Sequence, residues 1–311
     1  MSHNETGQFN PLTKDQKRFL VPRAQLNPDG AERKAGIEIE LSAPDIDVLV
    51  STVSSCFGGK AHRISQYERE VNDTEFGQFI VEVDYDYLKR AARESNESDS
   101  LVDDLQTQAL GTLSKGLVPY EIVTPPIPVT RLDCLEILTV KLRELGCKGT
   151  RDAIWKAYGV HYNPELAALD ADSVCRHLQA YVCLHDWLRE RESVDLARRV
   201  TPYIDPFGDD YTAHIIQEGY QPELSKLIDD YLHYNPTRNR TLDMLPLFSH
   251  LDDERVRNKV QDELIKSRPT FHYRLPNCDI DDPNWSMARA WNDWCVVEAL
   301  AKGKPVLRAV C

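Results

Sequence analysis

Two glutamates stand one residue apart in the otherwise apolar segment GIEIEL, residues 36–41. Residues two apart in a β-strand point to the same face, so Glu38 and Glu40 would lie side by side, where their charges repel. Such a pair is stable on a face open to water or around a bound cation that both carboxylates can ligate. For this segment alone, the solvated face is the simpler interpretation.

Other strand-like segments repeat this mixture of apolar and ionisable side chains. The ionisable residues are Glu82, Asp84 and Asp86 in residues 77–88, Glu121 in 117–129, His161 in 153–166, and His272 and Arg274 in 268–277. If these strands share a sheet, their polar side chains can converge on one face. Carboxylates with an imidazole suit Mg²⁺ or Mn²⁺. The plain alternatives, a solvated strand face for the acids and a structural role for the histidine, stay open.

The remaining pattern supplies elements to hold these strands. Apolar spacing predicts helices in residues 44–57, 131–145, 171–192, 221–234 and 281–303, the last of them capped by Asp281 or Asp282. Asn163 and Pro164 indicate a turn or helix start. We expect residues 1–33 to be a polar lead-in and residues 34–311 a single catalytic domain with an insertion at about 89–116. Strands mixed with helices, without strict βαβ alternation, predict an α+β fold with an antiparallel sheet.

Composition excludes several function classes for this chain of 311 residues. A net charge of −13 argues against a broad nucleic-acid surface. Neither a membrane-spanning segment nor a signal-peptide core is visible, and the eight cysteines form no CxxC pair, which favours reduced thiols in a cytoplasmic protein. The P-loop, GxGxxG, HExxH and GxSxG motifs are absent. The common enzymes with short local signatures are therefore disfavoured.

Taken in order along the chain, these segments resemble the amidoligase family, within the glutamine synthetase and glutamate–cysteine ligase-like superfamily of carboxylate–amine ligases. The motifs that carry the resemblance are GIEIE (36–40), VEVDYDYL (81–88), YEIVTPPI (120–127), GVHYNPE (159–165), RNRTLDMLPL (238–247) and RPTFHYRLP (268–276). The first motif is weak by itself. The ordered set is fairly specific and spans nearly the whole chain after residue 35.

The resemblance implies a curved antiparallel sheet flanked by helices, as in glutamine synthetase. It also implies ATP-dependent amide bond formation through an acyl phosphate, with Mg²⁺ or Mn²⁺ bound beside ATP. Small-molecule or peptide carboxylates and amines would be the substrates, with no nucleic-acid or membrane partner. The implied metal ligands are Glu38, Glu40, Asp84 (or Asp86), Glu121, His161 and His272. The implied ATP-binding residues are Glu38, Arg268 and Arg274, and the implied catalytic residues are Glu40, Arg240 and Arg274.

Two departures from the family pattern keep other functions open. His272 stands where the late strand of relatives carries a glutamate, which puts the last metal position in doubt. The segment 89–116 separates Asp84 from Glu121 more widely than in relatives, as an inert insertion or a lid over the site. The alternatives are therefore an inactive amidoligase-like binding protein and a metal-dependent hydrolase. Release of ADP that depends on an added amine separates the ligase from the hydrolase.

Overall fold

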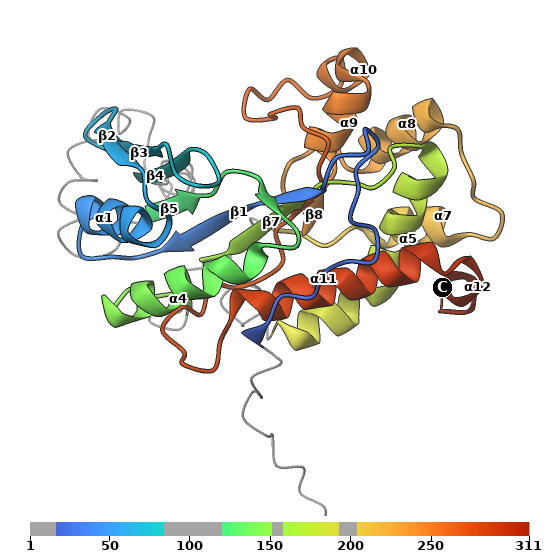
Figure 1. Ribbon diagram of the computed structural model, residues 1–311. Helices are drawn as coiled ribbons and strands as arrows, with labels where there is room; N and C mark the ends of the chain where they lie inside the picture. Colours follow the sequence, from blue (N-terminus) through green and yellow to red (C-terminus); the bar gives the residue numbers. More distant parts are fainter. Residues whose placement is uncertain (1–16, 84–119, 151–157, 193–203, 311) are drawn as a thin grey trace, which may run out of the picture.

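The computed structural model describes residues 17–83, 120–150, 158–192 and 204–310. Within these ranges nine strands form one open sheet, in the order β2-β3-β4-β5-β1-β7-β9-β8, with β6 also paired to β1 (Figure 1). The strands are β1 Lys34–Leu41, β2 Lys60–Arg63, β3 Glu68–Asn72, β4 Phe79–Val83, β5 Tyr120–Val123, β6 Ile127–Pro128, β7 Val160–Pro164, β8 Leu242–Asp243 and β9 His272–Tyr273. Every pairing between them is antiparallel.

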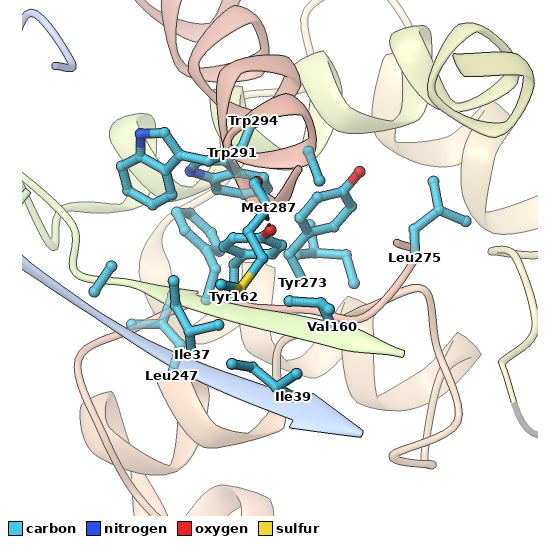
Figure 2. Close-up of a cluster of buried hydrophobic side chains, with 14 of the residues drawn as sticks. Ile37, Ile39, Val160, Tyr162, Leu247, Tyr273, Leu275, Met287, Trp291 and Trp294 are labelled. Atoms are coloured by element: carbon cyan, nitrogen blue, oxygen red, sulfur yellow. Dashed lines mark hydrogen bonds between the residues drawn. The ribbon is translucent and has the colours of Figure 1, made fainter. Parts of the chain in front are cut away.

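The central strand β1 separates an apolar face from a polar one. Ile37, Ile39 and Leu41 are fully buried, whereas Glu38 and Glu40 alternate with them and point to the opposite face. Figure 2 shows the apolar side, where Ile37 and Ile39 lie beside side chains of β7 and β9 and under the first turns of the last long helix. The core therefore lies on one face of the sheet and leaves the other face for polar side chains.

Helices cover this apolar face. Four of them are α1 Ile46–Phe57, α4 Leu135–Glu144, α5 Ala171–Arg191 and α11 Met287–Lys302, and α11 packs against both α4 and α5 (Figure 1). The others described are η2 Leu132–Cys134, α7 Asp209–Ile216, α8 Leu224–Tyr234, α9 Leu245–Leu251, α10 Asp253–Arg257 and α12 Lys304–Val310. On α11, Trp291 and Trp294 are fully buried over the sheet, as expected for a helix whose apolar residues recur at helical spacing.

The segment before β1 is fastened to α11 by a buried ion pair. The Nη1 and Nη2 atoms of Arg33 donate to Oε2 and Oε1 of Glu298 at 3.0 and 2.5 Å. Arg33 Nε also donates to the backbone oxygen of Glu165, next to β7, at 2.7 Å. Earlier in this segment, the backbone oxygen of Leu20 accepts a 2.8 Å hydrogen bond from Trp291 Nε1. These contacts hold β1 and β7 against the helical layer.

The α+β class with an antiparallel sheet is confirmed, as are the five predicted helices. Two predictions about the elements were incomplete or wrong. Strands β2 and β3 were not predicted, because all four residues of β2 are exposed and its sequence KAHR has no apolar alternation, and because the buried positions of β3 (EREVN) are Arg69 and Val71, only one of them apolar. Helix α11 begins later than expected: its N-cap is Ser286, which accepts from the backbone of Ala288, and not Asp281 or Asp282.

Several expectations fall outside the described residues or are not tested by them. Asp84, Asp86 and the segment 89–116 lie outside the described ranges, and the division into a lead-in and one domain stays a prediction. No helix in the described part of the chain is both long and apolar enough to cross a membrane. Among the described residues, six cysteines are free thiols, as expected for most of the eight, whereas Cys183 is disulfide-bonded.

Candidate metal centre

The register of the sheet brings four of the predicted ligands together on the polar face. Glu38 of β1 lies opposite His161 of β7, and Glu40 of β1 lies opposite Glu121 of β5. Directly paired residues in adjacent antiparallel strands point to the same face with Cβ atoms about 5 Å apart. The two neighbours of β1 therefore add one imidazole and one carboxylate to its pair of glutamates.

Two overlapping groups of side chains have the spacing to hold metal ions. One consists of Glu38, His161 and His272, and the other of Glu40, Glu121 and His161. In each group, one potential ligand atom from every residue lies within 4.8 Å of the others. Carboxylate oxygens suit hard divalent cations, and imidazole nitrogens suit Mn²⁺ and softer transition ions. The donor set therefore fits the kind of ion that the sequence predicted.

Backbone and side-chain contacts fix Glu40 in this arrangement. Its Oε2 accepts a 2.7 Å hydrogen bond from the backbone nitrogen of Gly159, the residue before β7. Its Oε1 lies 3.7 Å from His161 Nε2 and points into the ligand group. Glu40 is 7% exposed. A carboxylate held this way on a strand is oriented before any ligand arrives, which favours ion binding.

Asn163 contacts the first group by hydrogen bonds, although the Asn163-Pro164 pair in the sequence indicated a turn or helix start. It is still part of strand β7, two residues after His161, so its side chain lies on the same face. Its Nδ2 donates to Glu38 Oε1 at 3.0 Å, and its Oδ1 accepts from Arg268 Nη2 at 2.7 Å. The same Oδ1 lies 2.9 Å from His272 Nδ1. The alternation of β7 was the signal that could have identified Asn163, and the following proline concealed it.

Burial and neighbouring charges set the protonation of this group. Burial raises the pKa of the Glu38 carboxyl, but its basic neighbours His272, His161 and Arg268 outweigh burial and hold the pKa well below its usual value. For His272, burial is the largest effect and, with Arg268, lowers the pKa of the imidazole well below 6.5, against the opposing charge of Glu38. The result at neutral pH is an ionised carboxylate and a neutral imidazole, the forms that bind metal.

The three predicted arginines differ in their surroundings. Arg268 Nη2 lies 3.7 Å from Glu38 Oε1, beside the first ligand group. Arg274 is buried just after β9, and its charge acts on His272, while its Nη1 donates to the backbone oxygen of Arg238 at 2.7 Å.

Arg240 contacts neither ligand group in the hydrogen bonds and ion pairs of the described residues. Its Nε donates to Asn235 Oδ1 at 2.8 Å, and its Nη1 lies 3.9 Å from Asp205 Oδ2. The structure therefore gives Arg240 a role in holding the loop after α8, and its predicted part in catalysis stays a prediction. The metal-binding and ATP-binding roles of the other residues also stay predictions.

The fold and the site together define an α+β protein with paired carboxylate–imidazole groups on one face of an antiparallel sheet. The chain belongs to the amidoligase family: residues 31–296 match the family model described as "Putative amidoligase enzyme". No curated protein and no solved structure matches the chain significantly. Family membership indicates ligase activity, and the resemblance seen in the sequence motifs is confirmed.

Proposed function

We propose that this protein is an ATP-dependent carboxylate–amine ligase that forms an amide bond through an acyl phosphate. The observation that carries the proposal is the convergence of Glu38, Glu40, Glu121, His161 and His272 on one sheet face of an amidoligase family member. The proposal includes a glutamine synthetase-like arrangement of this face, with Mg²⁺ or Mn²⁺ and ATP above it.

The reaction requires charge neutralisation more than covalent help from the protein. A carboxylate oxygen of one substrate attacks the γ-phosphorus of ATP, ADP leaves, and the acyl phosphate forms. The amine nitrogen then attacks the acyl carbon, inorganic phosphate leaves, and the nitrogen gives up a proton. Divalent ions, when bound, would neutralise the phosphate oxygens and orient the transferred group. The protein supplies the preorganised charges that make this step favourable.

Different described residues would bind the metal ions and the negatively charged groups. Glu40, Glu121 and His161 would hold one ion, and Glu38 with His272 would hold another. Arg268, 3.7 Å from Glu38, adds a positive charge for phosphate oxygens or for the substrate carboxylate. Because Glu38 and Glu40 are held by hydrogen bonds from Asn163 and Gly159, they need little rearrangement when ions bind.

The proposal is tested by measuring ADP release from the purified protein with ATP, Mg²⁺ or Mn²⁺, and pooled carboxylates and amines. We expect release that requires both a carboxylate and an amine, together with a condensed product detected by mass spectrometry. Glu40→Gln keeps the side-chain shape and an acceptor for the Gly159 amide but removes a charged ligand, so activity should fall on the order of 10²-fold or more. Glu70→Gln on β3 is the matched control and should retain activity.

Two outcomes would contradict the ligase. Metal and ATP binding without any turnover across the screen would instead support an inactive binding protein. Turnover that needs no ATP, or that proceeds without an amine, would support a hydrolase. Full activity in Glu40→Gln would refute the assignment of this metal position even if the chain proved to be a ligase.

A further inference from the structure

Two histidines face the ligand groups, and the ring nitrogen that carries hydrogen decides which nitrogen can bind a metal ion. A neutral imidazole has one N–H and one lone pair, and the hydrogen bond at one nitrogen sets the tautomer. In this site, His272 Nδ1 contacts the Asn163 amide directly, whereas His161 Nδ1 contacts Glu38, whose other carboxylate oxygen accepts from the same amide. The orientation of that amide therefore bears directly on His272, and on His161 through the position of the Glu38 carboxylate.

Arg268 orients the amide. A guanidinium only donates hydrogen bonds, so the Asn163 atom 2.7 Å from Arg268 Nη2 must be the oxygen. The other end of the amide, Nδ2, then donates to Glu38 Oε1 at 3.0 Å. A flipped amide would place two donors against each other at Arg268 and two acceptors against each other at Glu38. Both neighbours therefore favour the same orientation.

The oriented amide sets the tautomer of His272. Asn163 Oδ1 can only accept, so His272 Nδ1, at 2.9 Å, must carry the hydrogen. Arg268 Nη2 and His272 Nδ1 lie 3.3 Å apart because both donate to this one oxygen. The lone pair of His272 is left on Nε2. A metal-ligating histidine whose other nitrogen donates to a carbonyl oxygen is the usual arrangement in metal sites.

The tautomer of His161 follows from the carboxylate that Asn163 holds. Glu38 Oε2 lies 3.1 Å from His161 Nδ1, and an ionised carboxylate only accepts. His161 Nδ1 therefore carries a hydrogen, which leaves Nε2, 3.7 Å from Glu40 Oε1, as the nitrogen that can face a metal ion. His161 then serves the Glu40–Glu121 group, and His272 serves Glu38.

The two positions differ in charge. The Glu40 position has two carboxylates and one imidazole. The Glu38 position has one carboxylate and one imidazole, and the Arg268 guanidinium lies 3.7 Å from that carboxylate. Mg²⁺ depends on anionic oxygen ligands and releases water reluctantly, whereas first-row transition ions gain from an imidazole ligand.

We propose that Asn163, oriented by Arg268, is a positioning residue that presents His161 and His272 to metal ions through Nε2. The Glu38–His272 position then takes a first-row transition ion such as Mn²⁺ or Co²⁺ in preference to Mg²⁺. The inference rests on the proposed function only because it concerns the same metal positions that would bind beside ATP. Its tests use no ATP and no substrate, so an inactive protein could still confirm it.

The tautomers can be measured directly in the metal-free protein. Selective ¹⁵N labelling of the nine histidines, with assignment by His161→Gln and His272→Gln, lets long-range ¹⁵N–¹H NMR identify the protonated nitrogen of each ring. We expect an Nδ1–H tautomer for both histidines. Asn163→Leu should move His272 towards the Nε2–H form, while Asn72→Leu on β3 should change neither ring. An Nε2–H form of His272 in the unaltered protein would overturn the proposal.

Metal selectivity is measured by electron paramagnetic resonance of Mn²⁺ in competition with Mg²⁺. We expect a large excess of Mg²⁺ to displace Mn²⁺ from one position and to leave a single Mn²⁺ bound, which His272→Gln should release. Asn163→Leu should weaken this Mn²⁺ about 10- to 100-fold, and His272→Glu should shift the preference towards Mg²⁺. If Asn163→Leu does not fold, Asn163→Asp, which keeps the acceptor, should retain the His272 tautomer. Equal displacement of Mn²⁺ from both positions would refute the selectivity.

Discussion

Replacing Glu298 by alanine should destabilise the protein far more than replacing a glutamate of an exposed ion pair. The side chains of Arg33 and Glu298 are 2% and 6% exposed, and their paired contacts measure 3.0 and 2.5 Å. Glu298 Oε1 also accepts from Trp294 Nε1 at 3.0 Å. Glu298→Ala would leave a buried guanidinium without its counter-ion and an indole N–H without its acceptor. The expected loss is about 3–5 kcal/mol of unfolding free energy.

A comparison pair of the same chemistry lies at the surface. Arg131 Nη2 and Glu75 Oε1 are 2.9 Å apart, and their side chains are 54% and 51% exposed. Solvent screens this pair, so Glu75→Ala should cost only about 0–1 kcal/mol. The contrast between the two glutamate variants isolates burial as the cause.

The assay is urea denaturation followed by tryptophan fluorescence. Combining Arg33→Met with Glu298→Leu removes both buried charges, so the double variant should be more stable than Glu298→Ala. A loss below about 1 kcal/mol in Glu298→Ala would refute the reasoning that the pair is desolvated and mutually dependent.

The same pair predicts a dependence of stability on pH. Burial raises the pKa of Glu298, but the hydrogen bonds and charge of Arg33 outweigh burial and lower it below 4.5. Because the folded-state pKa is the lower one, the contribution is present above the unfolded pKa and is lost as pH falls through the folded pKa. Glu298→Gln should reduce this loss of unfolding free energy at acidic pH, the acid limb of the stability profile. An unchanged acid limb would contradict the assignment.

Three further changes test the environment of the sheet and helices by urea denaturation. Burial raises the pKa of Asp243 to about 6, so the free energy of unfolding should fall as pH rises from about 4 past 6. Asp243→Asn should remove up to about 3 kcal/mol of this loss. Parallel pH profiles of the variant and the unaltered protein would contradict this prediction. Gly149→Ala would place a Cβ 1.9 Å from the backbone oxygen of Cys278 and should lower the free energy of unfolding by about 1–3 kcal/mol. In the control Gly208→Ala, the new Cβ has nothing within 4 Å, so stability should change little. Equal losses of stability in the two variants would refute the close approach at Gly149. Ser286→Ala should lower the free energy of unfolding by about 1 kcal/mol, because α11 loses its N-cap. An unchanged stability would indicate that an earlier residue caps the helix.

Local periodicity was enough to predict most of the elements and the face that two site residues share. Strict alternation in residues 36–41 places Glu38 and Glu40 together whatever the rest of the fold does, because the side-chain period of a strand is two. The helices were predictable because their apolar residues recur at helical spacing. The hairpin of β2 and β3 was not, since β2 is exposed throughout and one of the two buried positions of β3 is the charged residue Arg69.

The surroundings of individual side chains were less predictable. Asn163 looked like a turn residue because a proline follows it, yet the strand continues through both residues. The predicted arginines could not be separated by sequence, because each lies in a polar or aromatic context. In the folded chain, Arg268 contacts the amide at the centre of the site, whereas Arg240 binds Asn235.

The sequence by itself determined the family, the types of candidate ligand and their order along the chain. Only the tertiary structure decided that Glu121 and His161 lie on either side of the β1 glutamates and that His272 reaches them from β9. Strand order and register depend on contacts between residues far apart in the chain, which are selected by burying Ile37 and Ile39 beneath α11. Local periodicity records which way a side chain points, but long-range packing determines what it meets there.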